Sequence, residues 1–153
     1  MSMLVGVEGT LNGAIVPEIW ESEEEKGLSA WDLKKRCLAL AQNMFVRNPA
    51  VVVLNKDKNW PIELSRRVIS EWRIKSRTRE RILSIRMLDT MIAGARFLKT
   101  VEDAKDTAGI ESVSYFENQC RINGKLYKIN IVVKKQKGLE RRFAYYYSAT
   151  EAG

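Results

Sequence analysis

The chain has 153 residues and a formal net charge of +7, with 45% hydrophobic and 29% charged residues. This composition is typical of a soluble globular protein with one hydrophobic core. The longest apolar runs are only a handful of residues, for example Val51–Leu54, which excludes a membrane-spanning helix. There is no histidine and there are only two cysteines, which excludes the common zinc-binding patterns. We therefore expect no metal, no cofactor and no membrane partner, with the cytoplasm as the simplest compartment.

The first 28 residues form an acidic leader. Residues 1–27 contain six glutamates and one lysine, a net charge of −5, so the rest of the chain carries +12. We expect residues 1–28 to be a short hairpin or partly disordered, followed by a single domain over residues 29–153. A basic domain favours a polyanionic partner, but lysines and arginines that only solvate the surface explain its charge equally well.

A helix and a hairpin are predicted at the start of this domain. Ser29 is the expected N-cap of a helix whose apolar face includes Leu33 and Cys37. Residues 50–64 contain two extended runs around a polar turn, which predicts a hairpin. Pro61 places the second run at a sheet edge or at the start of a strand, because proline cannot donate to the ladder.

Two more helices are predicted before the last strands. Residues 65–77 are rich in arginine and predict a short helix or turn that anchors Trp72 in the core. Thr78 is the expected N-cap of a longer helix that continues to Leu98. Gly94 lies inside this helix, where glycine costs about 1 kcal/mol relative to alanine.

The last third of the chain predicts a β-meander. Residues 100–108 form an acidic connector, and strands follow at about residues 110–122, 125–135 and 140–150. The Asn123-Gly124 pair between the first two is a strong hairpin signal. The class is therefore α+β, with N-terminal helices packed on an antiparallel β-sheet that ends in a three-strand C-terminal meander.

The last two strands have an apolar face and a polar face. Alternation places Tyr127, Tyr145 and Tyr147 in the core. The opposite face carries residue types that bind phosphate or stack on bases, namely Lys128, Asn130, Lys134, Tyr146 and Ser148. A half-buried sheet with a solvated outer face explains the same residues equally well.

Three segments resemble a known family. They are the turn and strand NKDKNWPIELS (residues 55–65), the helix RILSIRMLDTMIAGARFL (residues 81–98) and the hairpin CRINGKLYKINIVVKKQKGLERRFAYYYSATE (residues 120–151). From about Trp31 onward, the chain resembles the barnase–EndoU–colicin–RelE-like nuclease domains of phages and mobile elements. This resemblance implies N-terminal helices followed by a four-stranded antiparallel sheet whose open face holds the site.

The resemblance also implies an activity, which is metal-independent cleavage of RNA by 2′-hydroxyl attack, in a toxin or effector. Without histidine, a lysine or tyrosine must move protons while arginine stabilises charge. We therefore assign catalysis to Lys128, Tyr146, Ser148 and Arg73, and nucleic-acid binding to Arg66, Arg67, Lys75, Asn130, Lys134 and Arg142. RNA is the expected partner, with a cognate inhibitor protein as a second. The alternative is a non-catalytic module of a mobile element that binds nucleic acid or a partner protein.

Overall fold

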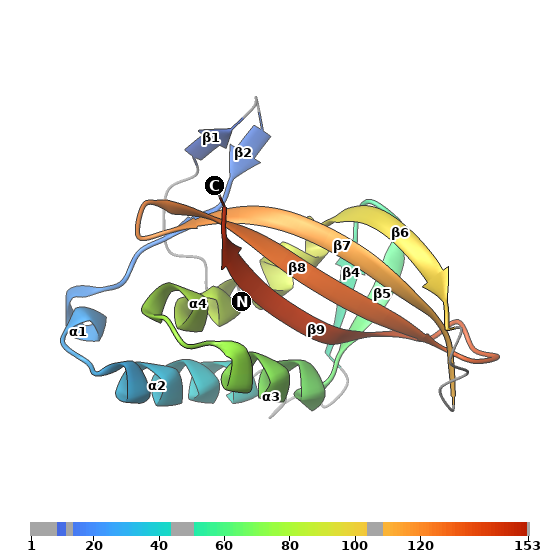
Figure 1. Ribbon diagram of the computed structural model, residues 1–153, viewed down its shortest axis with the longest axis horizontal. Coiled ribbons are helices and arrows are strands. Elements are labelled where there is room, and N and C mark those ends of the chain that lie inside the picture. Colours follow the sequence, from blue (N-terminus) through green and yellow to red (C-terminus); the bar gives the residue numbers. More distant parts are fainter. Residues whose placement is uncertain (1–8, 12–13, 44–50, 104–108, 153) are drawn as a thin grey trace.

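A curled sheet wraps around a small group of helices in the computed structural model, which describes residues 9–11, 14–43, 51–103 and 109–152 (Figure 1). Its helices are α1 (Glu23–Lys26), α2 (Ala30–Asn43), α3 (Arg66–Lys75), α4 (Arg79–Leu83) and α5 (Leu88–Ala93), with the 3-10 turn η1 (Ser84–Met87) after α4. Its strands are β1 (Gly9–Leu11), β2 (Ala14–Val16), β3 (Glu18–Ile19), β4 (Val51–Asn55), β5 (Trp60–Leu64), β6 (Arg96–Glu102), β7 (Ile110–Ile122), β8 (Lys125–Gln136) and β9 (Arg142–Glu151).

The main sheet is mixed. Its strand order is β3-β7-β8-β9-β5-β4, with β6 also paired to β7, and β1 and β2 form a separate pair. The strands β7, β8 and β9 form the predicted antiparallel meander, which confirms the α+β class. However, β3 runs parallel to β7 and β5 runs parallel to β9. The parallel β5–β9 pair is possible because the helices and the rest of the meander supply the long connection between them.

The first predicted helix and hairpin are confirmed. The Ser29 side chain accepts a hydrogen bond from the backbone N–H of Asp32 at 3.1 Å and so caps α2. Leu33 and Cys37 are buried on the inner face of this helix. Strands β4 and β5 pair in antiparallel fashion. Pro61 lies near the start of β5, one residue before pairing with β9 begins, so its missing N–H costs no ladder bond there.

The short helix α3 is confirmed, and the long helix predicted after it is wrong. Trp72 on α3 is fully buried and donates its indole N–H to the carbonyl of Arg81 at 3.1 Å. Thr78 caps α4 as predicted. The chain then tightens into η1, resumes as α5 and ends its last helix at Gly94, which is the C-cap rather than an interior residue.

Strand β6 occupies residues that were predicted to be helix and connector. It covers Arg96–Glu102 and pairs with β7. The reason is tertiary, because Phe97 packs edge-to-face on Trp60 and Phe116, with ring centroids 5.9 Å and 5.5 Å away. The last part of the predicted connector, residues 104–108, lies outside the described residues.

The hairpin turn between β7 and β8 is confirmed. Asn123 and Gly124 both have positive φ, at 52° and 81°, as a type I′ turn requires. A Cβ added at Gly124 would lie 3.2 Å from the Trp20 ring, so this position combines a left-handed backbone with a close neighbour. The three predicted strand ranges agree with the observed ones to within two residues.

A β-bulge in β9 overturns the prediction that Tyr145 is in the core. Val132 pairs with Tyr146, but Val133 pairs with Ala144, so Tyr145 is an extra residue in the ladder. The bulge shifts the alternation: Ala144 and Tyr147 are buried, whereas Tyr145 is only half-buried. Tyr127 and Tyr147 are core residues, as predicted.

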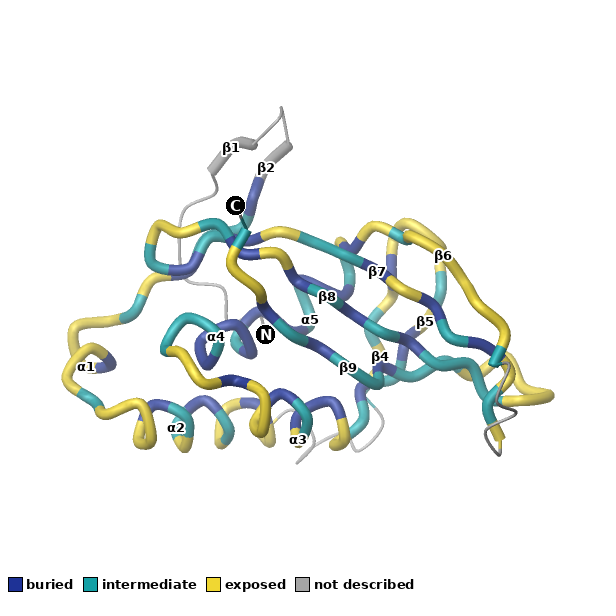
Figure 2. The backbone as a smooth tube through the Cα atoms, in the orientation of Figure 1, coloured by how far each residue is buried: buried dark blue, intermediate teal, exposed yellow. Residues whose placement is uncertain are grey.

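The core lies on the inner side of the curled sheet (Figure 2). Inward side chains of the meander, including Cys120, Ile129 and Ile131, pack with those of α4, η1 and α5. Tyr147 is fully buried and donates its hydroxyl to the carbonyl of Ser84 at 2.8 Å. The hydrogen bond ties the end of α4 to the centre of β9.

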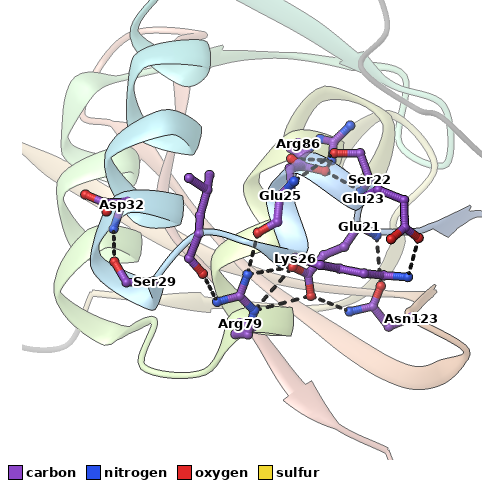
Figure 3. A network of polar contacts seen from close by, with 11 residues as sticks. Glu21, Ser22, Glu23, Glu25, Lys26, Ser29, Asp32, Arg79, Arg86 and Asn123 are labelled. Carbon is purple, nitrogen blue, oxygen red and sulfur yellow. Dashed lines mark hydrogen bonds and ion pairs between the residues drawn. The ribbon is translucent and has the colours of Figure 1, made fainter.

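The segment from β3 to α1 is attached to the domain by arginines (Figure 3). Arg79 binds the Glu21 carboxylate at 2.7 Å and the carbonyls of Leu28 and Glu25 at 2.8 Å each. Arg79 also holds the pKa of Glu21 below its ordinary value, mainly through that hydrogen bond. In the residues that the structure describes, no helix is long and apolar enough to cross a membrane.

Candidate functional site

The inner face of the meander changes from apolar to polar toward one end. Toward this end, Phe116 is the last buried aromatic residue of β7. The next inward positions, which lie before it in the chain, are Ser114 and then Ser112. On β8, Lys135 follows Val133 on the same face and pairs with Ser112. Arg142 on β9 pairs with Lys135. The sheet therefore ends in a surface of hydroxyls and cations rather than hydrophobic side chains.

These residues line a pocket, which we call the end pocket, with a volume of about 520 Å³. Its wall includes Trp60, Thr100, Glu111, Ser112, Ser114, Lys135 and Arg142. The hydroxyls of Thr100 and Ser114 lie 2.8 Å apart and share a hydrogen bond. A bulge at Glu111 interrupts the pairing of β7 with β8, and its carboxylate lies next to Lys135.

Two cations of the end pocket are enclosed, whereas the carboxylates that pair with them are open to solvent. The side chains of Lys135 and Arg142 are 15% and 14% exposed, against 46% for Glu111 and 83% for Glu140. Lys135 lies 2.6 Å from Glu111 and 3.4 Å from Glu140, and Arg142 lies 3.5 Å from Glu140. An incoming anion can therefore displace an exposed carboxylate and take over a cation that is already held in place.

The ion pair fixes the charge states in the pocket. The hydrogen bond from Lys135 holds the pKa of Glu111 below its ordinary value, and the same bond raises the pKa of Lys135. Glu111 is therefore a carboxylate and Lys135 an ammonium at neutral pH. The pair thus offers one proton acceptor and one proton donor.

An aromatic group closes the inner side of the end pocket. Trp60 packs edge-to-face on Phe97 and Phe116. The Arg142 guanidinium lies 3.8 Å from the centre of the Trp60 ring, a cation–π contact that orients it. The pocket also includes Glu102, Asp103 and Lys137, so its charges are nearly balanced.

The predicted catalytic residues of the meander lie on the other, outer face of the sheet. Asn130 pairs with Ser148 and Val132 with Tyr146, so these side chains follow one another along one surface. Lys128 is ion-paired with Glu117 at 3.4 Å. Six residues separate Lys128 from Lys134, about 20 Å along a strand. The structure thus spreads these candidates over a surface and does not gather them in one pocket.

A second group forms around Tyr145 on this outer face. Lys134 lies 3.5 Å and Arg67 4.4 Å from the centre of its ring, and Arg67 donates a hydrogen bond to its hydroxyl at 2.6 Å. Arg67 also approaches Glu71 at 3.8 Å. The structure therefore brings together Arg67 and Lys134, two predicted nucleic-acid ligands from different elements.

The other predicted cations lie on α3. Arg66, Arg73 and Lys75 are all exposed. Arg73 is in the last turn of α3. Figure 1 shows this helix beside β9, and none of its residues lines the end pocket. The predicted transition-state ligand Arg73 is therefore on a different surface from the end pocket.

Sequence reasoning placed Arg142 among the ligands but missed Glu111, Ser112, Ser114 and Lys135 as pocket residues. One signal was present, because Ser112 and Ser114 fall on the same alternation as Phe116 in β7. The bulge that brings Glu111 to Lys135 leaves no such signal.

The two cysteines offer no nucleophile, because burial raises the pKa of Cys37 to about 11 and of Cys120 to about 12. Among the described residues, no cluster of three acidic or cysteine side chains is placed to hold a metal ion.

Comparison with known proteins yields one family. The model of the family described as "Large polyvalent protein-associated domain 3" matches residues 31–146. No curated protein and no solved structure matches the chain.

Proposed function

The chain belongs to the large polyvalent protein-associated domain 3 family and is a polyvalent-protein-associated module of phages and mobile elements, and we propose that it acts on RNA. The proposed reaction is metal-independent cleavage by 2′-hydroxyl attack. The resemblance to barnase–EndoU–colicin–RelE-like nucleases suggests this reaction, and the end pocket supplies residues for it.

One observation carries the proposal, which is the placement of a carboxylate, an ammonium and a guanidinium around one pocket. Glu111 and Lys135 are 2.6 Å apart, and Arg142 is their neighbour across the β8–β9 ladder. Cleavage by 2′-hydroxyl attack needs a base, an acid and a cation for the charge on phosphorus. The end pocket supplies all three without histidine.

The roles follow from the charge states. Once the phosphate has displaced Glu111 from Lys135, the Glu111 carboxylate takes the proton of the 2′-hydroxyl, whose oxygen then bonds to phosphorus. The bond from phosphorus to the 5′ oxygen breaks, and the Lys135 ammonium gives that oxygen a proton. Arg142 binds the phosphate oxygens, where negative charge develops. The products are a 2′,3′-cyclic phosphate and a 5′-hydroxyl.

Product analysis tests the reaction. Incubation with a single-stranded RNA in the presence of EDTA should give fragments that end in 2′,3′-cyclic phosphate, and DNA of the same sequence should stay intact. Arg142→Gln should lower the rate at least about 100-fold, the usual loss for one group that stabilises the developing charge. Arg141→Gln is the matched control, because Arg141 is the preceding arginine and pairs with Glu63 instead. Intact RNA after incubation with folded wild-type protein at high concentration would refute the reaction.

A second candidate function, binding of nucleic acid without turnover, is favoured by the group around Tyr145. An aromatic ring with two cations beside it can bind a base and its phosphates without catalysing a reaction. This alternative predicts salt-dependent RNA binding and no fragments. A cognate inhibitor protein remains a prediction of the resemblance.

A further inference from the structure

Helix α2 and the end of α3, with Arg77 just after it, present four cations and an exposed tryptophan. We define the α2–α3 face by Trp31, Lys34, Lys35, Arg73 and Arg77. The two helices contact each other and lie along one side of the molecule (Figure 1). The end pocket, in contrast, is built from β5 to β9.

Three cations of this face, Lys34, Arg73 and Arg77, lie close to one another. The Lys34 ammonium donates a hydrogen bond to the carbonyl of Arg73 at 2.9 Å, which fixes it at the end of α3. Burial, and then the positive charges of Arg77 and Arg73, lower the pKa of Lys34. In the described part of the chain, none of the four cations of this face forms an ion pair with a carboxylate. The helix dipole favours cations in the last turn of α3, but Lys34 and Lys35 come from the first half of another helix.

Trp31 is the most exposed of the four tryptophans, at 69%, and Trp20 follows at 48%. It lies in the first turn of α2, and Lys35 approaches its ring to 5.9 Å one turn later. Its position contributes little to the core, so packing does not explain an aromatic side chain there. An indole ring beside unpaired cations is the arrangement by which proteins hold single-stranded nucleic acid: the bases stack on the ring while cations follow the phosphates.

We propose that the α2–α3 face is a binding site for single-stranded RNA, separate from the end pocket. A base stacks on Trp31, and Lys34, Lys35, Arg73 and Arg77 contact the phosphates beside it. This inference rests on the proposed function for its choice of RNA, and it assigns Arg73 to substrate binding rather than to the reacting phosphate.

Binding of a non-cleavable probe tests this site independently of catalysis. The probe is a fluorescent, fully 2′-O-methylated single-stranded 12-mer, titrated with the full chain while anisotropy is recorded at several salt concentrations. Trp31→Ala should weaken binding between about 5-fold and 150-fold, the loss expected for one stacked base. Trp20→Ala is the matched control and should leave the Kd unchanged.

Charge variants test the phosphate contacts. The double variant Arg73→Gln/Arg77→Gln should reduce the slope of log K against log salt by about 1.4, since each phosphate contact on a single strand contributes about 0.7. Arg121→Gln/Lys125→Gln removes the same charge at the β7–β8 turn and should change the slope much less.

Three results would overturn the site. The first is an equal change in the salt slope for the two double variants, and the second is an unchanged Kd for Trp31→Ala. The third is displacement of the probe by polyglutamate at the same charge concentration as by RNA, which would indicate that the partner is an acidic protein instead. If the reaction fails but these binding results hold, only the proposed catalysis is lost. If the site fails, saturating enzyme should still cleave RNA.

Discussion

Replacing Arg79 by methionine should destabilise the protein strongly, because Arg79 attaches the segment before α2 to the helices. Its guanidinium makes hydrogen bonds to the Glu21 carboxylate and to two backbone carbonyls, and the Glu21 side chain is only 6% exposed. Methionine keeps the apolar stem but leaves a buried carboxylate without its cation. Breaking a buried pair costs about 3–5 kcal/mol, and since Arg79 itself is 30% exposed, we expect about 3 kcal/mol.

The assay is equilibrium unfolding in urea, with thermal unfolding as a second readout. A loss of about 3 kcal/mol corresponds to a fall in Tm of about 6–12 °C for a chain of this size. Arg36→Met is the control, because Arg36 pairs with Glu24 at the surface and should contribute nothing measurable. If the two variants unfold at the same urea concentration, the attachment through Arg79 does not stabilise the fold.

The pH dependence gives a further check on the same contact. The pKa of Glu21 is lowered in the folded protein, so the stability from its carboxylate is present above the unfolded pKa and is lost as pH falls through the folded pKa. The difference in stability between wild type and Arg79→Met should therefore shrink below about pH 4.5, the ordinary value. A difference that stays constant down to pH 2 would contradict the ion pair as its source.

Three other predictions concern the core, the turn and the pocket. Tyr147→Phe should cost about 0.5–1.5 kcal/mol in urea unfolding because it removes the hydrogen bond from the buried Tyr147 hydroxyl to the Ser84 carbonyl, and an unchanged midpoint would refute this bond. Gly124→Ala should destabilise the protein by about 1–2 kcal/mol or more, and by more than Gly138→Ala. Both glycines have positive φ, but only at Gly124 would the added Cβ lie 3.2 Å from the Trp20 ring. Equal losses would show that the Trp20 contact is unimportant. In the proposed reaction, the acidic limb of the pH–rate profile should lie below pH 4.5, because the base Glu111 has a lowered pKa and works ionised. Lys135→Gln should move that limb to higher pH, and a limb at an unchanged pH would exclude Glu111 as the base.

Patterns that depend on local chemistry could be predicted from the sequence. The caps at Ser29 and Thr78, the Asn123-Gly124 turn and the alternation of β8 each follow from neighbouring residues, and each is confirmed. The long helix failed because the stripe of apolar residues continues past Gly94, while the aromatic contacts of Phe97 with two distant strands decide for a strand.

The site was harder to predict, since it depends on irregularities in pairing. A bulge in β9 moves Tyr145 out of the core, and a bulge in β7 lies at Glu111, the residue that forms an ion pair with Lys135. The polar outer face was recognised, but an alternation pattern cannot tell which face of a curled sheet holds a pocket. Lys34 could not be linked to the arginine-rich segment from the sequence, because its contact with α3 exists only in the fold.

The most direct test of the account compares two glutamates of β7 as Gln variants, Glu111 in the end pocket and Glu117 beside Lys128. The measurement is the single-turnover rate constant for cleavage of a single-stranded RNA at saturating protein in EDTA. The account predicts a loss of about 100-fold or more for Glu111→Gln and a rate near that of wild type for Glu117→Gln. Equal rates for wild type and Glu111→Gln would contradict the assignment of the reaction to the end pocket.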